Sequence, residues 1–315
     1  QMPGETYAEG TVFGKTGSAS TLIAGDLYNV TLRAVDLYNN RASDGRQVLL
    51  SANDIYAVVP PVQSLAIGQT VFSGFLASAA TGNLVISGVD FDLGALTGQA
   101  LSGISVVPGT PDRLMVVLNG ETLVPGKNIA PFGVSGIPTE STATVPFTAT
   151  VYATDSRYNV STVTLTDGSS IKMTSNDTFA PNVGVPVSLS AGAASFAPIQ
   201  LRTAGARTLT ATHLSGGGPA LAAGVSNTFN YLPFNPTNLR TLTPSESRVP
   251  GSTTNGRSGP AFTVQAGFSF TATVDITDSF WNLTPGATHQ IRLVADDPFA
   301  VIVPTTQVIT TSATY

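Results

Sequence analysis

The stretch Phe147-Thr148-Ala149-Thr150-Val151 alternates apolar residues with threonine, and the segment Asp155-Ser156-Arg157-Tyr158-Asn159 follows it closely. Alternation with a period of two predicts a β-strand with one buried face, and an Asp-x-x-x-Asn segment predicts a tight turn. Both return at Phe270–Val274 and Asp278–Asn282, which is 270 − 147 = 123 residues later. A repeat of this length indicates a tandem architecture.

A looser copy of the strand and turn occurs at Tyr28–Leu32 and Asp36–Asn40. Prolines punctuate the chain near 108–111 and 233–236, where they fix φ, remove a backbone donor and favour stiff linkers. The sequence therefore predicts three repeats: residues 1–108, without a counterpart of the strand Arg113–Leu118; residues 109–234, complete; and residues 235–315, C-terminally incomplete.

Each complete repeat contains about seven short segments of strand character separated by turn residues, and no segment has convincing helical periodicity. This pattern predicts an all-β chain of tandem immunoglobulin-like Greek-key β-sandwiches. The alternation predicts a buried core in the second repeat and equivalent residues in the third. The residues are Phe147, Val151, Phe196, Leu201, Leu209 and Phe229, with Phe270 and Val274 in the third repeat.

Composition excludes several functional classes. Only 10% of the 315 residues are charged and the net charge is −5, which disfavours nucleic acid because phosphate binding needs clustered Lys and Arg. The chain has no cysteine, which removes disulfides, thiol nucleophiles and zinc ribbons. No apolar run approaches the roughly 20 residues of a spanning helix, so we expect no membrane span.

Three segments together resemble bacterial immunoglobulin-like repeats of the invasin and filamin types: Phe147–Asn159, Thr174–Asp177 and Thr203–Thr212. The resemblance extends over essentially the whole chain in about two and a half copies. It implies an extracellular, cell-surface location and rigid rods, adhesins, or subunits of surface layers and filaments. The implied partners are neighbouring copies of the same protein or further repeats of the same polypeptide.

The turns also invite a calcium interpretation, with Asp155, Asn159 and Asp177 as candidate ligands. Calcium takes 6–8 oxygen ligands, and carboxylates are sparse in this sequence. The favoured interpretation is turn chemistry, in which Asp accepts backbone N–H bonds and Asn adopts the left-handed conformation that ends the turn. We therefore expect no metal and no cofactor.

Four Asn-x-Ser/Thr sequons are candidate glycosylation sites: Asn29, Asn159, Asn176 and Asn282. Asn159 and Asn282 hold equivalent turn positions, which we expect to lie outside. The chain has only two histidines, His213 and His289, at unrelated positions in their repeats, and one per repeat makes neither a metal site nor a catalytic triad. No residue is a candidate for catalysis.

These observations predict a non-enzymatic structural array that provides rigid spacing and lateral or serial self-contacts. Low charge suits packing against like neighbours, because few charges need desolvation on contact. The alternative is an adhesin or carbohydrate-binding module that contacts surface glycans. The incomplete end repeats predict either a longer polypeptide or strands donated by neighbouring copies.

Overall fold

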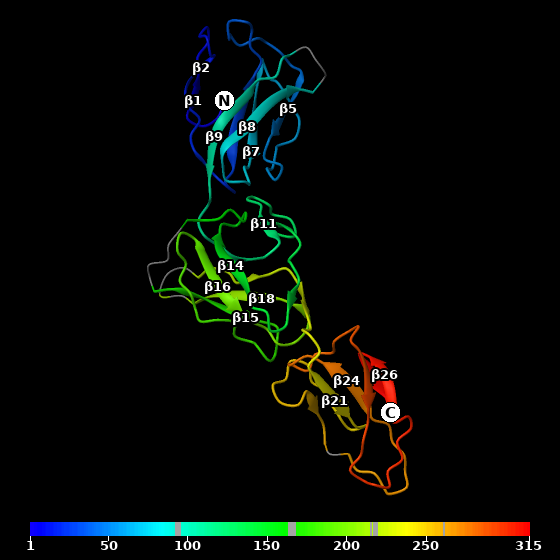
Figure 1. Cartoon of the computed structure of the whole chain (residues 1–315). Coiled ribbons are helices and arrows are strands. Elements are labelled where there is room, and N and C mark those ends of the chain that lie inside the picture. The colour runs from blue at the N-terminus through cyan, green and yellow to red at the C-terminus, as the bar shows by residue number, and fades with distance from the viewer. Residues whose placement is uncertain (92–95, 163–167, 215, 217–219, 261) are drawn as a thin grey trace.

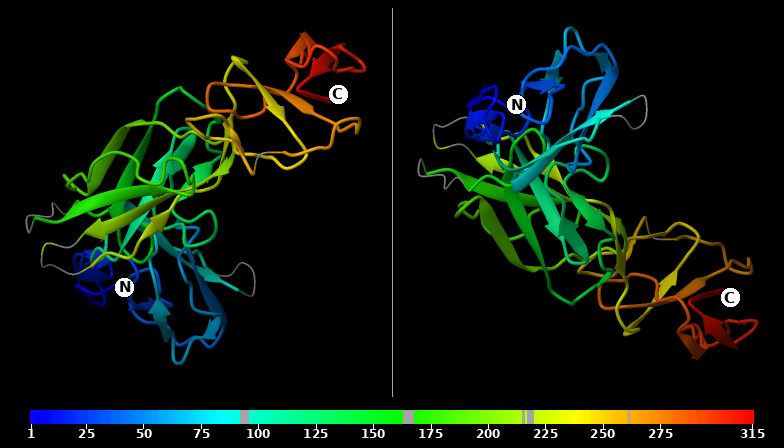
Figure 2. Two further views of the ribbon diagram at one scale, coloured as in Figure 1. Left: turned by 90° about the horizontal axis from the view of Figure 1, so that it is seen from below. Right: turned by 90° about the horizontal axis from the view of Figure 1, so that it is seen from above.

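The computed structural model describes residues 1–315 except 92–95, 163–167, 215, 217–219 and 261. The described residues form strands and turns without any α-helix, so the all-β prediction is confirmed. None of them belongs to a helix long and apolar enough to cross a membrane. Figure 1 shows three bodies in succession. In both views of Figure 2 the third body is displaced to one side of the other two, so the three are not collinear.

The second repeat is a β-sandwich with two main sheets. Its strands are β10 (Arg113–Leu118), β11 (Glu121–Leu123), β12 (Val134–Gly136), β13 (Ser141–Thr142), β14 (Phe147–Thr154), β15 (Ser170–Ser175), β16 (Ala193–Ile199), β17 (Gly205–Arg207), β18 (Leu209–Leu214), β19 (Gly224–Val225) and β20 (Phe229–Leu232). One sheet has the order β10-β14-β16 and the sheet facing it has the order β15-β18-β19. Strand β20 pairs with β17 antiparallel and with β13 in parallel.

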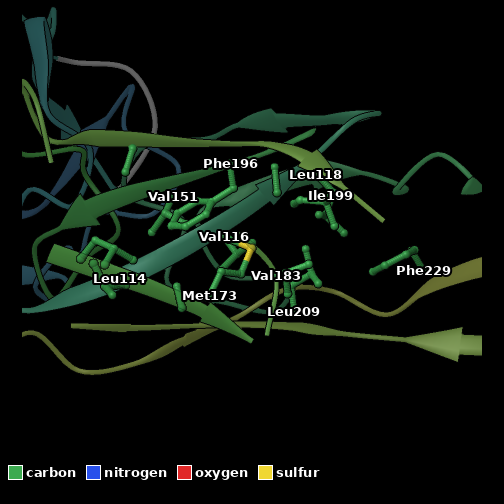
Figure 3. Packing of buried hydrophobic residues seen from close by; sticks show 14 of the residues in the cluster. Leu114, Val116, Leu118, Val151, Met173, Val183, Phe196, Ile199, Leu209 and Phe229 are labelled. Carbon is green, nitrogen blue, oxygen red and sulfur yellow. The ribbon is translucent and has the colours of Figure 1, made fainter. Parts of the chain in front are cut away.

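The core of the second repeat lies between these two sheets (Figure 3). Val151 and Phe196 extend from β14 and β16 towards Leu209 on the facing sheet. Of the predicted core, Val151, Phe196, Leu201, Leu209 and Phe229 are buried, which confirms the predicted face of the strands. Phe147 is partly buried and packs edge-on against Phe229, with ring centroids 5.5 Å apart.

The first repeat has the same plan. Its strands are β1 (Glu5–Tyr7), β2 (Lys15–Gly17), β3 (Leu22–Ile23), β4 (Tyr28–Arg33), β5 (Gln47–Ala52), β6 (Gln63–Ser64), β7 (Gln69–Phe75), β8 (Thr81–Asp90) and β9 (Ala100–Val107). The pair β4-β7 packs against the sheet β3-β9-β8-β5-β6. Gln1 exchanges two backbone hydrogen bonds with Thr31 (2.9 and 3.0 Å), and Met2 is buried. These two residues lie where β10 ends in the second repeat, a counterpart that the sequence did not predict.

The third repeat has one main sheet, β21-β24-β27-β26-β25. Its strands are β21 (Asn238–Leu242), β22 (Ser247–Arg248), β23 (Arg257–Ser258), β24 (Thr273–Thr277), β25 (Thr288–Arg292), β26 (Thr306–Thr310) and β27 (Ser312–Thr314). Val274 is buried as predicted, but the prediction for Phe270 is wrong, because that side chain is 47% exposed. Phe147 is covered by Phe229 and Tyr231 of β20, whereas Phe270 packs against Phe262, with ring centroids 4.9 Å apart.

Candidate functional site

The Asp-x-x-x-Asn turn has the same internal hydrogen bonds in all three repeats. In the second repeat, Asp155 Oδ1 accepts the backbone N–H groups of Arg157 (2.8 Å) and Asn159 (3.0 Å). The turns that begin at Asp36 and Asp278 contain the same pair of bonds. The predicted role of the aspartate as a turn acceptor is confirmed.

The left-handed residue of the turn is not the final asparagine, as the sequence predicted, but the residue before it. The φ angles are 62° at Asn39, 63° at Tyr158 and 62° at Trp281. A glycine faces the left-handed residue in each repeat. A Cβ on Gly133 would lie only 2.8 Å from the Cβ of Tyr158, so a larger residue there would clash. The final asparagine is therefore free for another role.

That role is a contact between repeats. Asn159 is fully buried, although it lies at the end of a turn. Its Nδ2 donates to Asp155 Oδ2 (2.9 Å) within the turn and to Ser78 O (2.8 Å) in the first repeat. Its Oδ1 accepts the N–H of Ala80 at 2.7 Å. The side-chain amide thus donates to one backbone carbonyl and accepts from one backbone N–H of the preceding repeat, as a backbone peptide group does in a β-sheet.

The segment Ser78–Ala80, which we call the first corner, is held by an aspartate of its own repeat. Asp54 Oδ2 accepts the N–H groups of Ser78 (2.7 Å) and Ala79 (2.9 Å). These bonds satisfy two of the corner's donors and leave the Ser78 carbonyl and the Ala80 N–H for Asn159. Ser78 Oγ also donates to Gly126 O at 2.7 Å, which adds a further bond between the repeats.

The linker between the repeats is held at the same place. The N–H of Gly109 donates to Asp155 Oδ2 at 2.8 Å. A single carboxylate therefore closes its own turn, orients Asn159 and fixes the linker. We call the contacts among the first corner, the linker and the Asp155–Asn159 turn joint 1.

The second and third repeats are connected by the same set of contacts, which we call joint 2. Asn282 Nδ2 donates to Arg202 O (2.8 Å), and Ala204 N donates to Asn282 Oδ1 (2.9 Å). Asp278 Oδ2 accepts the N–H of the linker residue Phe234 at 3.0 Å. The second corner, 202–204, is held by Asp177, which accepts the N–H groups at 202 and 203.

Joint 2 also contains an aromatic contact. Phe280, in the third turn, packs against the core cluster of the second repeat. The guanidinium carbon of Arg202 lies 5.8 Å from the centroid of this ring. Arg157 holds the equivalent turn position in joint 1. A partly buried ring that packs across a domain boundary adds to the backbone bonds in stabilising one relative orientation.

Residues outside the turns also support joint 2. Arg240 and Asp275 form a buried ion pair (2.6 Å between Nη2 and Oδ2) where the second repeat has Met115 and Tyr152. The same guanidinium donates to the carbonyl of Trp281 at 3.0 Å, which holds the third turn in place. In the second repeat, the Tyr231 hydroxyl donates to the carbonyl of Leu201, next to the second corner (2.9 Å), and burial raises the pKa of Tyr231 to about 12.

The second corner depends on an ionised carboxylate. Burial raises the pKa of Asp177, but hydrogen bonds from the Thr203 hydroxyl (2.6 Å) and three backbone N–H groups outweigh it and hold the pKa below its ordinary value. Because the folded pKa is the lower one, this contribution is present above the unfolded pKa of about 3.9 and is lost as the pH falls through the folded pKa.

The proposed calcium ligands do not come together as one site. Asp155 and Asn159 lie in joint 1, whereas Asp177 lies in joint 2. The oxygens of both carboxylates accept hydrogen bonds from N–H or O–H groups. The described residues contain no group of three or more His, Cys, Asp or Glu side chains that could hold a metal ion. This donor set does not fit calcium.

Two of the four sequons are placed differently from the prediction. Asn159 and Asn282 are 0% and 1% exposed, and the amide nitrogen of each donates within its turn and to the preceding repeat. The expectation that these positions lie outside is wrong, because a neighbouring repeat covers them. Asn29 and Asn176 are exposed.

Comparisons with known proteins add little beyond the fold. No family model and no curated protein matches the chain. Among solved structures, it is similar to InvD of Yersinia pseudotuberculosis, with 15% identity over 94% of this chain and 81% of that one, at a TM-score of 0.28. The BSP domain of a biofilm-associated protein is 13% identical, and the match covers 69% of this chain and 29% of that one at a TM-score of 0.20. Red sea bream transglutaminase is 15% identical, and the match covers 68% of this chain and 30% of that one at a TM-score of 0.22. TM-scores this low do not bear on function.

Proposed function

We propose that this chain is a non-enzymatic structural repeat array of an extracellular surface, surface-layer or filament protein, and that its joints hold successive repeats at fixed angles. The observation that supports this most directly is the repetition of the same buried Asp–Asn contacts in joint 1 and joint 2. Two flexibly linked domains would have no need of a fully buried asparagine paired with the neighbour's backbone.

The energetics of the joints support the same proposal. Each hydrogen bond across joint 1 stabilises the closed arrangement by roughly 0.5–1.5 kcal/mol net, because water replaces the bond when the joint opens. Proline near each linker reduces the conformational freedom gained on opening. Both effects favour one arrangement of the repeats, and fixed angles are what a spacer needs.

The buried carboxylates of the described residues also have structural partners. Asp54 and Asp177 hold corners, and Asp155 and Asp278 hold turns and linkers. The remaining buried carboxylates, Glu5, Asp90 and Asp275, form ion pairs with Lys or Arg side chains. No observation of this kind favours the alternative of a carbohydrate-binding module. Tyr158, for example, has Phe132 stacked on it at 5.3 Å and the Arg113 guanidinium over the ring at 5.1 Å.

Spin-label distances test the proposal directly. The natural chain lacks cysteine, so pairs of substitutions label specifically. Val71→Cys with Val225→Cys spans joint 1, and Val225→Cys with Val308→Cys spans joint 2; all three side chains are exposed. Double electron–electron resonance should give one narrow distance distribution for each pair. Broad distributions in the unmodified joints would contradict the proposal.

A further inference from the structure

The first repeat carries the same turn as the other two, and among the residues that the structure describes no other repeat forms a hydrogen bond with it. Asp36 Oδ1 accepts the N–H groups of Tyr38 (2.9 Å) and Asn40 (2.8 Å), and Asn40 Nδ2 donates to Asp36 Oδ2 (3.1 Å). These are the bonds found inside joints 1 and 2. The turn therefore forms without the contact to a preceding repeat.

The groups that make the contact in joints 1 and 2 are exposed in the first repeat. Both Asp36 and Asn40 are exposed. Within the part of the chain that the structure describes, Asn40 Nδ2 donates only inside the turn and its Oδ1 accepts no hydrogen bond. Asp36 Oδ2 likewise has no linker N–H there, whereas the same oxygen in Asp155 accepts one from Gly109.

The glycine that lies against the corner is also in place. A Cβ on Gly126 would lie 2.5 Å from Ala79 of the first corner, and one on Gly251 would lie 2.0 Å from Thr203 Oγ1 of the second. Gly10 is the counterpart in the first repeat, and its φ of 67° is similar to the 77° of Gly126 and the 85° of Gly251. It is exposed, and a Cβ on it would have only the side chain of Asn40 within 4 Å.

An exposed aromatic residue in the same turn is a second indication of a contact surface, independent of the hydrogen bonds. Tyr38 is 71% exposed and holds the turn position of Phe280, which packs against the preceding repeat's core in joint 2. Its neighbour Leu37 is 90% exposed. A large apolar surface next to unpaired polar groups indicates a contact surface rather than a solvated turn.

We propose that the Asp36–Asn40 turn, with Gly10 and Tyr38, is a receiving surface for the corner of another immunoglobulin-like repeat of this type. The inference rests on the proposed function. The occupant follows from joints 1 and 2, where the corner contributes a carbonyl and an N–H two residues later. Because these are backbone groups, the sequence of the incoming corner is free to vary, as Ser78–Ala80 and 202–204 already do.

The test is an extended chain in which a second copy of residues 109–241 precedes Gln1. Gln1 pairs with Thr31 as Leu242 pairs with Thr273, so this junction continues the first strand in register. Labels at Val225→Cys in the added copy and at Val71→Cys should give one narrow distance distribution. The exchange of the Asn40 Nδ2 proton that is not bonded to Asp36, followed by NMR, should slow roughly tenfold relative to the original chain, as expected when a second hydrogen bond protects the amide.

Two variants make the test specific. Asn40→Ala removes the polar contact and should broaden the distribution in the extended chain, while it leaves the distance across joint 1 unchanged. Tyr38→Ala removes only the ring and should broaden the distance distribution in the extended chain less than Asn40→Ala does. A broad distribution in the extended chain, with joints 1 and 2 still narrow, overturns this inference and leaves the proposed function standing. Broad distributions at all three junctions overturn both.

Discussion

The turns Asp155–Asn159 and Asp36–Asn40 have the same internal hydrogen bonds and differ in what lies against them. In the second repeat, both end residues are buried under the first corner; in the first repeat, both are exposed. The comparison teaches that the turn and the joint are separable. The turn is local and forms from its own sequence, and the joint uses groups that the finished turn presents.

The largest effect should come from the core that supports joint 1. Phe196→Ala in β16 should destabilise the second repeat by about 3–5 kcal/mol, because it leaves a cavity between the two main sheets. Chemical denaturation, followed by hydrogen exchange for each repeat, measures this loss. It gives the scale against which losses at the joint are compared. A loss below about 1 kcal/mol would mean that Phe196 is not central.

Asp155→Ala should be next in size. It leaves the N–H group of Asn159, which is buried, and those of Arg157 and Gly109, which are partly buried, without their acceptor, and we expect this to cost about 3 kcal/mol in the second repeat. The matched control, Asp36→Ala, should cost clearly less, since water reaches that turn. Equal losses in the two repeats, measured by the same denaturation experiment, would show that the turn alone explains the effect.

Asn159→Ala isolates the joint from the turn. It removes the bonds to Ser78 and Ala80 and the side-chain bond to Asp155 Oδ2, but it keeps the two backbone bonds to Asp155 Oδ1 that shape the turn. We expect a loss of about 2 kcal/mol and a broadened spin-label distance across joint 1. Asn40→Ala in the 315-residue chain is the control and should change neither. An unchanged distance in Asn159→Ala would mean that the linker alone fixes the angle.

The smallest effect concerns acid. Because the pKa of Asp177 lies below its ordinary value, stability should fall as the pH drops below about 4, where the unfolded chain takes up the proton first. Asp177→Asn is isosteric and should reduce the slope of stability against pH in that range. A slope identical to that of the unmodified chain would contradict the role given to this carboxylate.

The sequence was informative where contacts are local or periodic. Alternation placed Val151 and Phe196 in the core, and Asp-x-x-x-Asn predicted the turn acceptor. It was wrong about Phe270, because the repeat pattern does not reveal which strand covers a given face. Equal patterns in Phe147 and Phe270 thus have different surroundings.

The joints could not be predicted in this way. Asn159 meets Ser78 and Ala80 across about eighty residues of sequence, and the partner groups are backbone atoms that carry no sequence pattern. A signal was nevertheless present. An aspartate recurs before each corner, at Asp54 and Asp177, and an asparagine recurs after each linker, at Asn159 and Asn282. A periodic interface between neighbouring repeats predicts such a recurrence of one residue in each repeat and its counterpart in the next.

The glycine that faces each left-handed turn residue has an evolutionary consequence. Asn39, Tyr158 and Trp281 differ greatly in size, yet each has a φ near 62° and a glycine opposite it. The glycine leaves space beside the left-handed residue, so unbranched side chains of very different size fit there, whereas a β-branched residue would be strained at this φ. Loss of the glycine would be tolerated only after the opposite residue itself became glycine, because the close approach is to the Cβ of that residue, and each of these glycines has a φ between 65° and 69°. The order of substitutions is therefore constrained, and this position can diversify along a lineage while its partner stays invariant.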